Sequence, residues 1–292
     1  MSASKGQLLR LAIKEQQPLL AMGAFDAMTM RMVDRAGFRA AYIGSFATAA
    51  SVAGLPDFGL LSATEMADQM NRLASATSLP CIADGDTGYG NAINVQRTVQ
   101  LFEAAGVAAI QIEDQVSPKK CGHIAGKDVI PGDQMVQKVR AAVAARKDPD
   151  FLIIARSDAR AVHGIDDAIA RCRAYAEAGA DVLFVDAPES LNEIERIGKE
   201  LKKTSKLQLF NMAPTGKSPK IGAKQLAAFG FDIIIFPIEA ILAAYPAILE
   251  VMSTIRRDGS SEAMTNRMAS FKDITNLLDL DLYYEKEREF AG

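Results

Sequence analysis

A cysteine surrounded by potential cations follows a hydrophobic segment near the middle of the chain. Residues 107–112 are apolar enough for a buried strand, and Glu113 and Asp114 come directly after them. The loop that follows carries Cys121, whose neighbours in the chain include Lys119, Lys120 and His123. Nearby positive charge favours the thiolate over the thiol, which predicts a proton donor or a nucleophile. A surface cysteine in a basic loop fits this stretch equally well.

Two further acids follow another predicted strand upstream. Residues 81–83 lead into Asp84 and Asp86, and alternate residues of an extended segment point to the same side. Two converging carboxylates suit Mg²⁺ or Mn²⁺, which prefer oxygen ligands and keep several waters. The alternative is a solvated acidic turn. Glycines that let the backbone approach a ligand closely weaken that alternative, and they are Gly85, Gly88 and Gly90.

The elements that must position these residues alternate regularly. Apolar segments predict eight strands, at residues 18–22, 40–43, 79–83, 107–112, 151–155, 181–185, 207–210 and 232–236. A segment with helical spacing follows each of them, and several of these helices end in glycine, at Gly37, Gly106, Gly179 and Gly230. This order predicts an α/β fold, a parallel (β/α)₈ barrel of the TIM type. An open doubly wound sheet is the alternative, but no Gly-x-Gly-x-x-Gly follows the first strand.

Composition limits the classes of protein that this chain can represent. It has 292 residues, of which 49% are hydrophobic and 24% charged, and its net charge of −3 gives no reason to expect nucleic acid. We expect a barrel domain over residues 1–257 and a helical extension of the same domain over residues 258–292. Residues 1–14 lack an apolar signal core, and no uncharged apolar run is long enough to cross a bilayer. Three irregularly spaced cysteines indicate a reducing compartment, so a cytoplasmic location is expected, with Cys81 and Cys172 in the core.

Polar residues follow successive predicted strands, at the end of the barrel where active sites lie. Besides the two acidic clusters, these residues are Tyr42, Gly44, Ser45, Asp57, Arg156, Asp186 and Asn211. A random surface distribution would not place acids and an arginine after consecutive strands. Asp26 and Asp158 are expected to be helix N-caps instead, and His163 is expected to be structural.

The acidic and cysteine motifs together resemble the isocitrate lyase / phosphoenolpyruvate mutase superfamily. The matching segments are Asp-Gly-Asp-Thr-Gly-Tyr-Gly, starting at Asp84, and Glu-Asp-Gln…Lys-Lys-Cys-Gly-His, starting at Glu113. The similarity runs from Gly23 to the C-terminal helices, and it points to the branch that includes 2-methylisocitrate lyase and dimethylmalate lyase. Phosphonomutases of the superfamily carry Lys-Thr-Asn-Ser in this loop, so Cys121 argues against their activity.

The resemblance implies a role for each candidate residue. Asp86 would be the direct ligand of Mg²⁺ or Mn²⁺, and water-mediated contacts would come from Asp84, Asp57 and Glu113. Arg156 would clamp a substrate carboxylate through its planar fork, and further substrate contacts would come from Gly44, Ser45, Gly122 and Asn211. Cys121, Gly122 and His123 would form the catalytic segment of the loop, with Cys121 as the proton donor. The general base would be either Tyr42 or a water held by Glu113.

The implied reaction is metal-dependent cleavage of the C2–C3 bond of a 2-hydroxy dicarboxylate or tricarboxylate, which yields an α-keto acid such as pyruvate and a carboxylate. Three departures from the family pattern narrow the substrate. Leu242 stands in place of an arginine, and Pro214 and Asp186 replace glutamates. These changes favour 2-alkylmalate or 2,3-dimethylmalate over 2-methylisocitrate. The alternatives are an oxaloacetate hydrolase or decarboxylase, a phosphonomutase, and a non-catalytic metabolite-binding barrel.

The resemblance also implies an assembly. C-terminal helices in this superfamily swap between neighbouring subunits, so we expect a homo-oligomer, a homotetramer built as a dimer of dimers. A small di- or tricarboxylate is the other expected partner, with no nucleic acid and no membrane.

Overall fold

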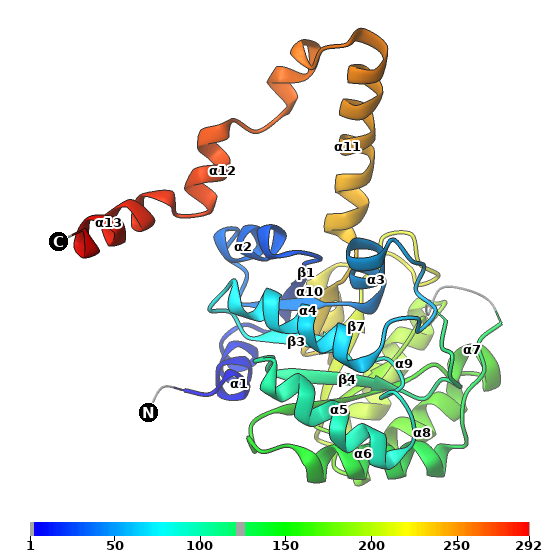
Figure 1. Cartoon of the computed structure of the whole chain (residues 1–292). Helices are drawn as coiled ribbons and strands as arrows, with labels where there is room; N and C mark the ends of the chain where they lie inside the picture. The colour runs from blue at the N-terminus through cyan, green and yellow to red at the C-terminus, as the bar shows by residue number, and fades with distance from the viewer. Residues whose placement is uncertain (1–2, 121–125, 292) are drawn as a thin grey trace.

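Eight parallel strands form a closed barrel, as the sequence predicts (Figure 1). The computed structural model describes residues 3–120 and 126–291. The strands pair in chain order, and β8 closes the barrel against β1. Their bounds are β1 Leu19–Gly23, β2 Ala40–Ile43, β3 Cys81–Asp84, β4 Ala109–Glu113, β5 Leu152–Ser157, β6 Val182–Val185, β7 Leu207–Asn211 and β8 Ile233–Phe236.

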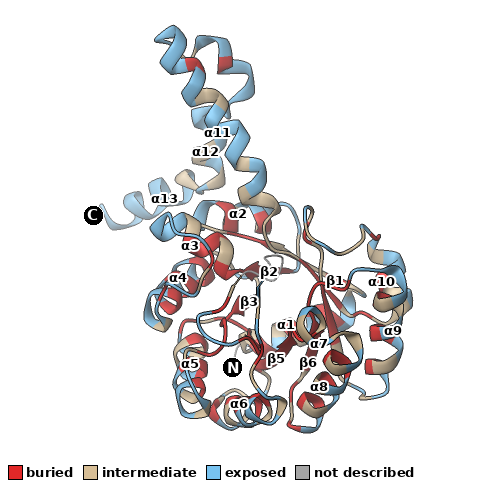
Figure 2. Ribbon diagram, turned by 90° about the vertical axis from the view of Figure 1, so that its right-hand side faces the viewer, coloured by how far each residue is buried: buried red, intermediate tan, exposed pale blue. Residues whose placement is uncertain are grey.

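Helices surround the strands on the outside of the barrel, with their buried faces turned inward (Figure 2). The predicted helices are α2 Ala27–Arg35, α4 Ala63–Ser75, α5 Ala92–Ala104, α6 Gly132–Ala145, α8 Ile165–Glu177, α9 Leu191–Lys202, α10 Ala223–Phe229 and α11 Glu239–Asp258. Three helices in the barrel region were not predicted, and they are α1 Lys5–Glu15, α3 Ser45–Ala53 and α7 Arg160–His163. No helix within the described residues is both long and apolar enough to span a membrane.

Two apolar layers hold the barrel together. The inner layer fills the centre with strand side chains that include Ala21, Ile82, Leu152 and Ile154. The outer layer lies between strands and helices, where Phe102 is fully buried. Burying one such side chain stabilises the fold by about 1.5–3 kcal/mol. Because the centre is filled, the barrel is a packed core, and ligands must bind at its end.

Helix α1 closes the N-terminal end of the barrel. Ser4 caps this helix by accepting a hydrogen bond from the backbone N–H of Gln7 at 3.1 Å. Its apolar residues Leu9, Ala12 and Ile13 join the inner cluster. The opposite end, where the strands have their C-terminal residues, therefore remains as the place for a site.

Helix α3 begins directly after β2, with Gly44 as its N-cap and Ser45 as its first residue. Ser45 therefore enters the site from a helix N-terminus rather than from a loop. The N-cap expected at Asp26 is confirmed, because its carboxylate accepts a hydrogen bond from Thr29 N at 2.7 Å at the start of α2.

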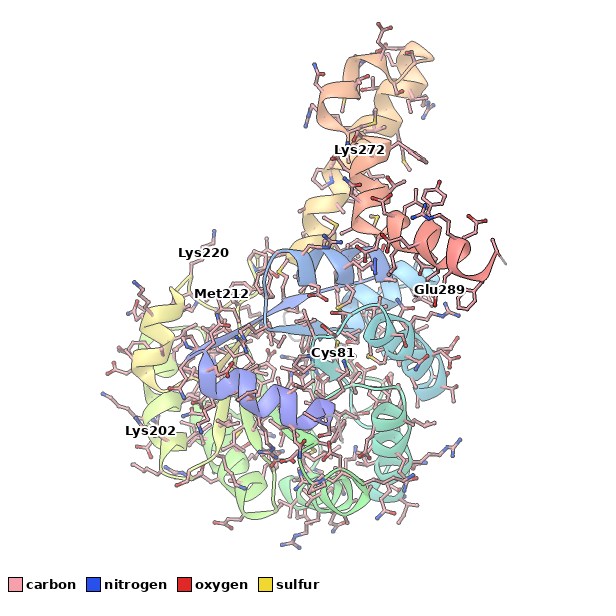
Figure 3. The ribbon with its side chains drawn as sticks, turned by 90° about the vertical axis from the view of Figure 1, so that its left-hand side faces the viewer. Cys81, Lys202, Met212, Lys220, Lys272 and Glu289 are labelled. Atoms are coloured by element: carbon pink, nitrogen blue, oxygen red, sulfur yellow. The ribbon has the colours of Figure 1, made fainter. Side chains whose placement is uncertain are left out.

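The chain after β8 leaves the barrel. Helix α11 projects outward, and α12 (Phe271–Leu277) and α13 (Leu280–Phe290) turn back beside α2, after the 3-10 helix η1 (Glu262–Arg267) (Figure 1). Figure 3 shows Lys272 and Glu289 on this extension, outside the barrel. Arg31 and Arg35 of α2 form ion pairs with Asp279. Large apolar side chains of the extension are exposed, and they include Tyr245, Met252, Phe271 and Phe290.

The contact between β1 and β8 generates a stability prediction. A Cβ atom added at Gly23 would lie 2.3 Å from the carbonyl oxygen of Pro237, a backbone atom that has little freedom to move. Gly23→Ala should therefore lower the free energy of unfolding by about 1–3 kcal/mol, the usual cost of overpacking. Gly222→Ala is the matched control, because nothing lies within 4 Å of its Cβ position. Denaturant unfolding should separate the two variants, and equal stabilities would contradict the packing argument.

Candidate active site

A cavity of about 250 Å³ lies at the C-terminal ends of the strands. It brings together most of the described residues that the sequence marked as candidates, and these are Tyr42, Gly44, Ser45, Asp57, Asp84, Arg156 and Asn211. Lys119 also lines it. Much of the remaining lining is apolar, and it consists of Phe46, Ala213, Ile235, Pro237, Ile238 and Leu242. Cys121, Gly122 and His123 lie outside the described residues.

Asp84 is held in place by donors from helix α3, from the loop after β3 and from strand β4. Its Oδ2 accepts hydrogen bonds from Ser45 Oγ at 2.8 Å and from Ser45 N at 3.3 Å. Its Oδ1 accepts hydrogen bonds from Asp86 N at 3.1 Å and from Gln111 Nε2 at 3.4 Å. The Tyr42 hydroxyl donates to Gln111 Oε1 at 3.3 Å, which links β2 to the same network. We expected Ser45 to contact the substrate, but its backbone amide and its hydroxyl both donate to Asp84 in this structure.

Lys119 lies among the acids of the predicted metal site. Its Nζ is 2.5 Å from Asp57 Oδ1 and 2.9 Å from Asp86 Oδ1, and it donates to Ser45 Oγ at 2.8 Å. The side chain is only 4% exposed. Sequence reasoning placed this lysine beside Cys121 and missed its ion pairs, because nothing in the local pattern shows how the loop folds over β2 and β3.

Burial shifts the proton affinities of these groups. It raises the pKa of Asp86 to about 6, although the neighbouring ammonium of Lys119 opposes the shift. Burial also raises the pKa of Glu113 well above its usual value, against the effect of Arg156. For Lys119 burial alone would lower the pKa, but Asp86 and the other acids raise it overall, so the lysine stays charged.

The guanidinium of Arg156 faces three carboxylates. Its Nε and Nη2 each donate to one oxygen of Asp158 at 2.9 Å, and Nη2 also donates to Asp186 Oδ2 at 2.9 Å. Glu113 Oε2 lies 3.3 Å from Nε. The planar fork that we assigned to a substrate carboxylate is therefore used by Asp158. These bonds use Nε and Nη2 rather than Nη1, and Arg156 lines the cavity.

The N-cap expected at Asp158 is wrong. Its carboxylate pairs with Arg156 and accepts a hydrogen bond from Lys127 Nζ at 2.8 Å, whereas the cap residue of α7 is Ala159. Burial opposes its ionisation, but the two cations hold the pKa of Asp158 well below its usual value. Asp158 is therefore a buried counterion of Arg156 and Lys127.

Asp114 holds the backbone next to this ion network through hydrogen bonds, a role that the sequence analysis missed. Its Oδ1 accepts a hydrogen bond from Asp158 N at 2.8 Å. Its Oδ2 accepts hydrogen bonds from Ser157 Oγ at 2.8 Å and from Tyr175 OH at 2.7 Å. Asp114 is fully buried, so it fixes the end of β5 and with it the position of Asp158.

The donor chemistry of the site fits a divalent cation. Three largely buried cations, Lys119, Lys127 and Arg156, face six buried carboxylates, which are Asp57, Asp84, Asp86, Glu113, Asp158 and Asp186. Within the described residues Glu113 Oε1 has no hydrogen-bond partner, and neither has Asn211 Oδ1. No three acidic, histidine or cysteine side chains of residues 3–120 and 126–291 converge as a complete cage. Water would have to complete the coordination, as it usually does for Mg²⁺.

Comparison with known proteins identifies the family. Residues 9–256 match the phosphoenolpyruvate phosphomutase family model. The chain is 41% identical to 2,3-dimethylmalate lyase of Eubacterium barkeri, over 97% of each chain. It is 36% identical to 2-methylisocitrate lyase of Shewanella oneidensis, over 98% of this chain and 97% of that one. A solved phosphonopyruvate hydrolase in complex with oxalate and Mg²⁺ has a TM-score of 0.89 at 33% identity, over 99% of this chain and 100% of that one. The chain belongs to the phosphoenolpyruvate phosphomutase family, which confirms the resemblance seen in the sequence.

The position of Lys119 generates a second prediction. Lys119→Met removes a buried ammonium from Asp57 and Asp86, so in EDTA the free energy of unfolding should fall by about 3 kcal/mol or more. Added Mg²⁺ or Mn²⁺ should then raise the melting temperature of this variant more than that of the wild type, because the cation replaces the lost charge. Lys120→Met is the control, since that ammonium bonds the exposed carbonyl of Gly126. A Lys119 variant that is as stable as the wild type in EDTA would show that the acids need no counterion.

Proposed function

We propose that this protein is a carbon–carbon lyase that cleaves the C2–C3 bond of a 2-hydroxy dicarboxylate. The observation that carries the proposal is the cavity itself, which combines the buried charged side chains of Asp57, Asp84, Lys119 and Arg156 with several apolar side chains. The polar side suits a metal ion and the acid end of a substrate. The apolar side suits an alkyl group.

The metal site proposed here uses the chain's own acids. Asp86 would contact Mg²⁺ or Mn²⁺ directly, and Asp57, Asp84 and Glu113 would hold its waters. When bound, the cation supplies a Lewis acid that polarises the oxygens at C1 and C2 of the substrate. The Lys119 ammonium, which is 2.9 Å from Asp86 Oδ1, would have to leave this place.

Substrate binding would use donors that the ion network leaves free. Nη1 of Arg156 would donate to a carboxylate oxygen, and Gly44 and Ser45 would border the same group at the start of α3. Asn211 would contribute its amide, whose Nδ2 lies 3.5 Å from Asp186 Oδ1. Because Asp158 and Asp186 fix the guanidinium, the donor is oriented before the substrate arrives.

The reaction needs one proton removed and one supplied. A water held by Glu113, whose pKa burial raises, would take the proton of the 2-hydroxyl. The C2–C3 bonding pair then moves to C3, C2 becomes the carbonyl of the α-keto acid, and the carbanion at C3 takes a proton from Cys121. His123 would assist from the same loop. Burial and Asp84 raise the pKa of Tyr42 well above its usual value, so Tyr42 is better suited to donate a hydrogen bond than to act as the base.

The apolar wall favours a substrate with an alkyl branch. Leu242 and Ile238 line the cavity where a tricarboxylate would need a partner for its third acid. A buried charged group without a partner costs on the order of 1–3 kcal/mol or more. A 2-alkylmalate such as 2,3-dimethylmalate therefore fits better than 2-methylisocitrate.

We further propose that residues 258–292 extend the same domain and take part in a homotetramer. Support comes from exposed apolar side chains in these residues, which include Phe271, Tyr283 and Phe290, and from others on the preceding helix α11. Such a surface is typical of an interface between subunits. A cytoplasmic location is proposed with it.

A substrate panel tests the proposed function. Purified protein with Mg²⁺ should release pyruvate from 2,3-dimethylmalate, and EDTA should abolish the release. The value of kcat/KM for 2-methylisocitrate should be lower by roughly tenfold or more, which matches the cost of the unpaired acid. Release of oxalate from oxaloacetate would favour the hydrolase alternative. A protein that releases neither pyruvate nor oxalate from any of these acids would contradict the proposal and favour a binding protein.

The proposed role of Cys121 gives a selective labelling prediction. Burial raises the pKa of Cys81 to about 12 and also raises that of Cys172, so both thiols should resist iodoacetamide. Cys121 should react first, and a bound diacid should protect it. Cys121→Ser should lower kcat by about 10²–10⁴-fold, the usual contribution of a general acid, with unchanged Mn²⁺ affinity. A serine variant with the native rate would remove Cys121 from the mechanism.

A further inference from the structure

A buried lysine on helix α6 bonds the loop that carries the proposed metal ligand. The side chain of Lys138 is largely buried, and its Nζ donates to the carbonyl oxygen of Thr87 at 2.9 Å. Thr87 directly follows Asp86 in the chain. The lysine therefore reaches from the outer helix layer to the backbone beside the cavity.

The loop needs such support because its backbone is strained. Asp86 has φ +48°, in the left-handed region, where a residue other than glycine costs about 1–2 kcal/mol. Other bonds hold the loop on either side. Glu113 N donates to Asp86 O at 2.9 Å, and Thr98 Oγ1 donates to Gly88 O at 3.0 Å. The bond from Lys138 lies between these two and holds the peptide between Thr87 and Gly88, one peptide beyond the one that follows Asp86.

Burying a charged side chain to bond one carbonyl oxygen costs free energy. Burial lowers the pKa of Lys138, while Asp114 and Glu113 oppose that shift. A neutral donor would bond the carbonyl at lower cost. The ammonium makes a stronger, charge-assisted hydrogen bond and places a positive charge behind the acids of the site.

We propose that Lys138 is a positioning residue that holds Asp86 in its metal-binding conformation before the metal arrives. The inference rests on the proposed metal site. Lys138 acts through the Thr87 carbonyl and touches neither substrate nor cation. Without the bond from Lys138, the backbone of Asp86 can leave the left-handed region. Binding a cation then has to restore the backbone conformation of Asp86 and the position of its carboxylate, which weakens binding.

Mn²⁺ titration of Lys138→Met, followed by electron paramagnetic resonance, tests the proposal. Methionine keeps the length of the side chain and removes the donor and the charge. Its Kd for Mn²⁺ should rise by about 10–100-fold, the usual effect of losing a group that orients a metal ligand. The kcat at saturating metal should fall much less. Arg140→Met is the matched control, because it removes the same charge from an exposed position on α6 and should leave Kd unchanged.

Hydrogen exchange in EDTA adds a readout that does not depend on metal. Amides of residues 85–90 should exchange faster in Lys138→Met than in Arg140→Met. If Lys138→Met does not fold, Lys138→Gln, which is too short to keep the bond, is measured in the same way. A folded variant with native Mn²⁺ affinity and native exchange would overturn the proposal. A wild-type protein that binds no Mn²⁺ would refute the metal site instead, and exchange alone would then decide whether Lys138 fixes the loop.

Discussion

An excess of buried negative charge is the constraint on which the rest of this structure depends. Six carboxylates gather at the C-terminal ends of the strands, and among the described residues Lys119, Lys127 and Arg156 form ion pairs with them. An isolated buried carboxylate is costly, so the chain places Lys119 among the acids of β3 and fixes Arg156 among those of β4 to β6. Burial raises the pKa of Asp86 and Glu113, and neighbouring carboxylates add to the effect.

The barrel can hold these charges because the strand register and the closed N-terminal end leave the charged side chains little freedom to move. Glu113 of β4 pairs directly with Arg156 of β5, and Arg156 pairs with Phe184 of β6, whose ring lies 5.2 Å from the guanidinium carbon. Asp114 then bonds the backbone of Asp158, so the neighbours of the arginine are fixed as well. Apolar residues of helix α1 join the inner cluster at the opposite end of the barrel.

The sequence predicted the barrel because strand and helix periods alternate along it, and strand ends marked many of the polar residues that line the cavity. It missed α3, whose apolar residues are mostly small, and it missed α1 although that helix carries Leu8, Leu9 and Ile13. It also misassigned Asp158. An aspartate can cap a helix or form an ion pair, and only the neighbouring strands of the folded barrel determine which of the two it does. The place of Lys119 depends on how its loop folds over two strands, and the local sequence does not determine that. The roles of Cys121 and His123 remain predictions.

The central claim is that the site is built for a divalent cation and that Lys119 occupies its place in the metal-free protein. The most direct measurement is a crystal structure with Mn²⁺, with anomalous scattering used to locate the metal. We expect one strong anomalous peak beside the carboxylate of Asp86, with the Lys119 ammonium moved out of contact with Asp57 and Asp86. An ammonium that keeps its 2.9 Å contact with Asp86, with no anomalous peak among these acids, would contradict the account.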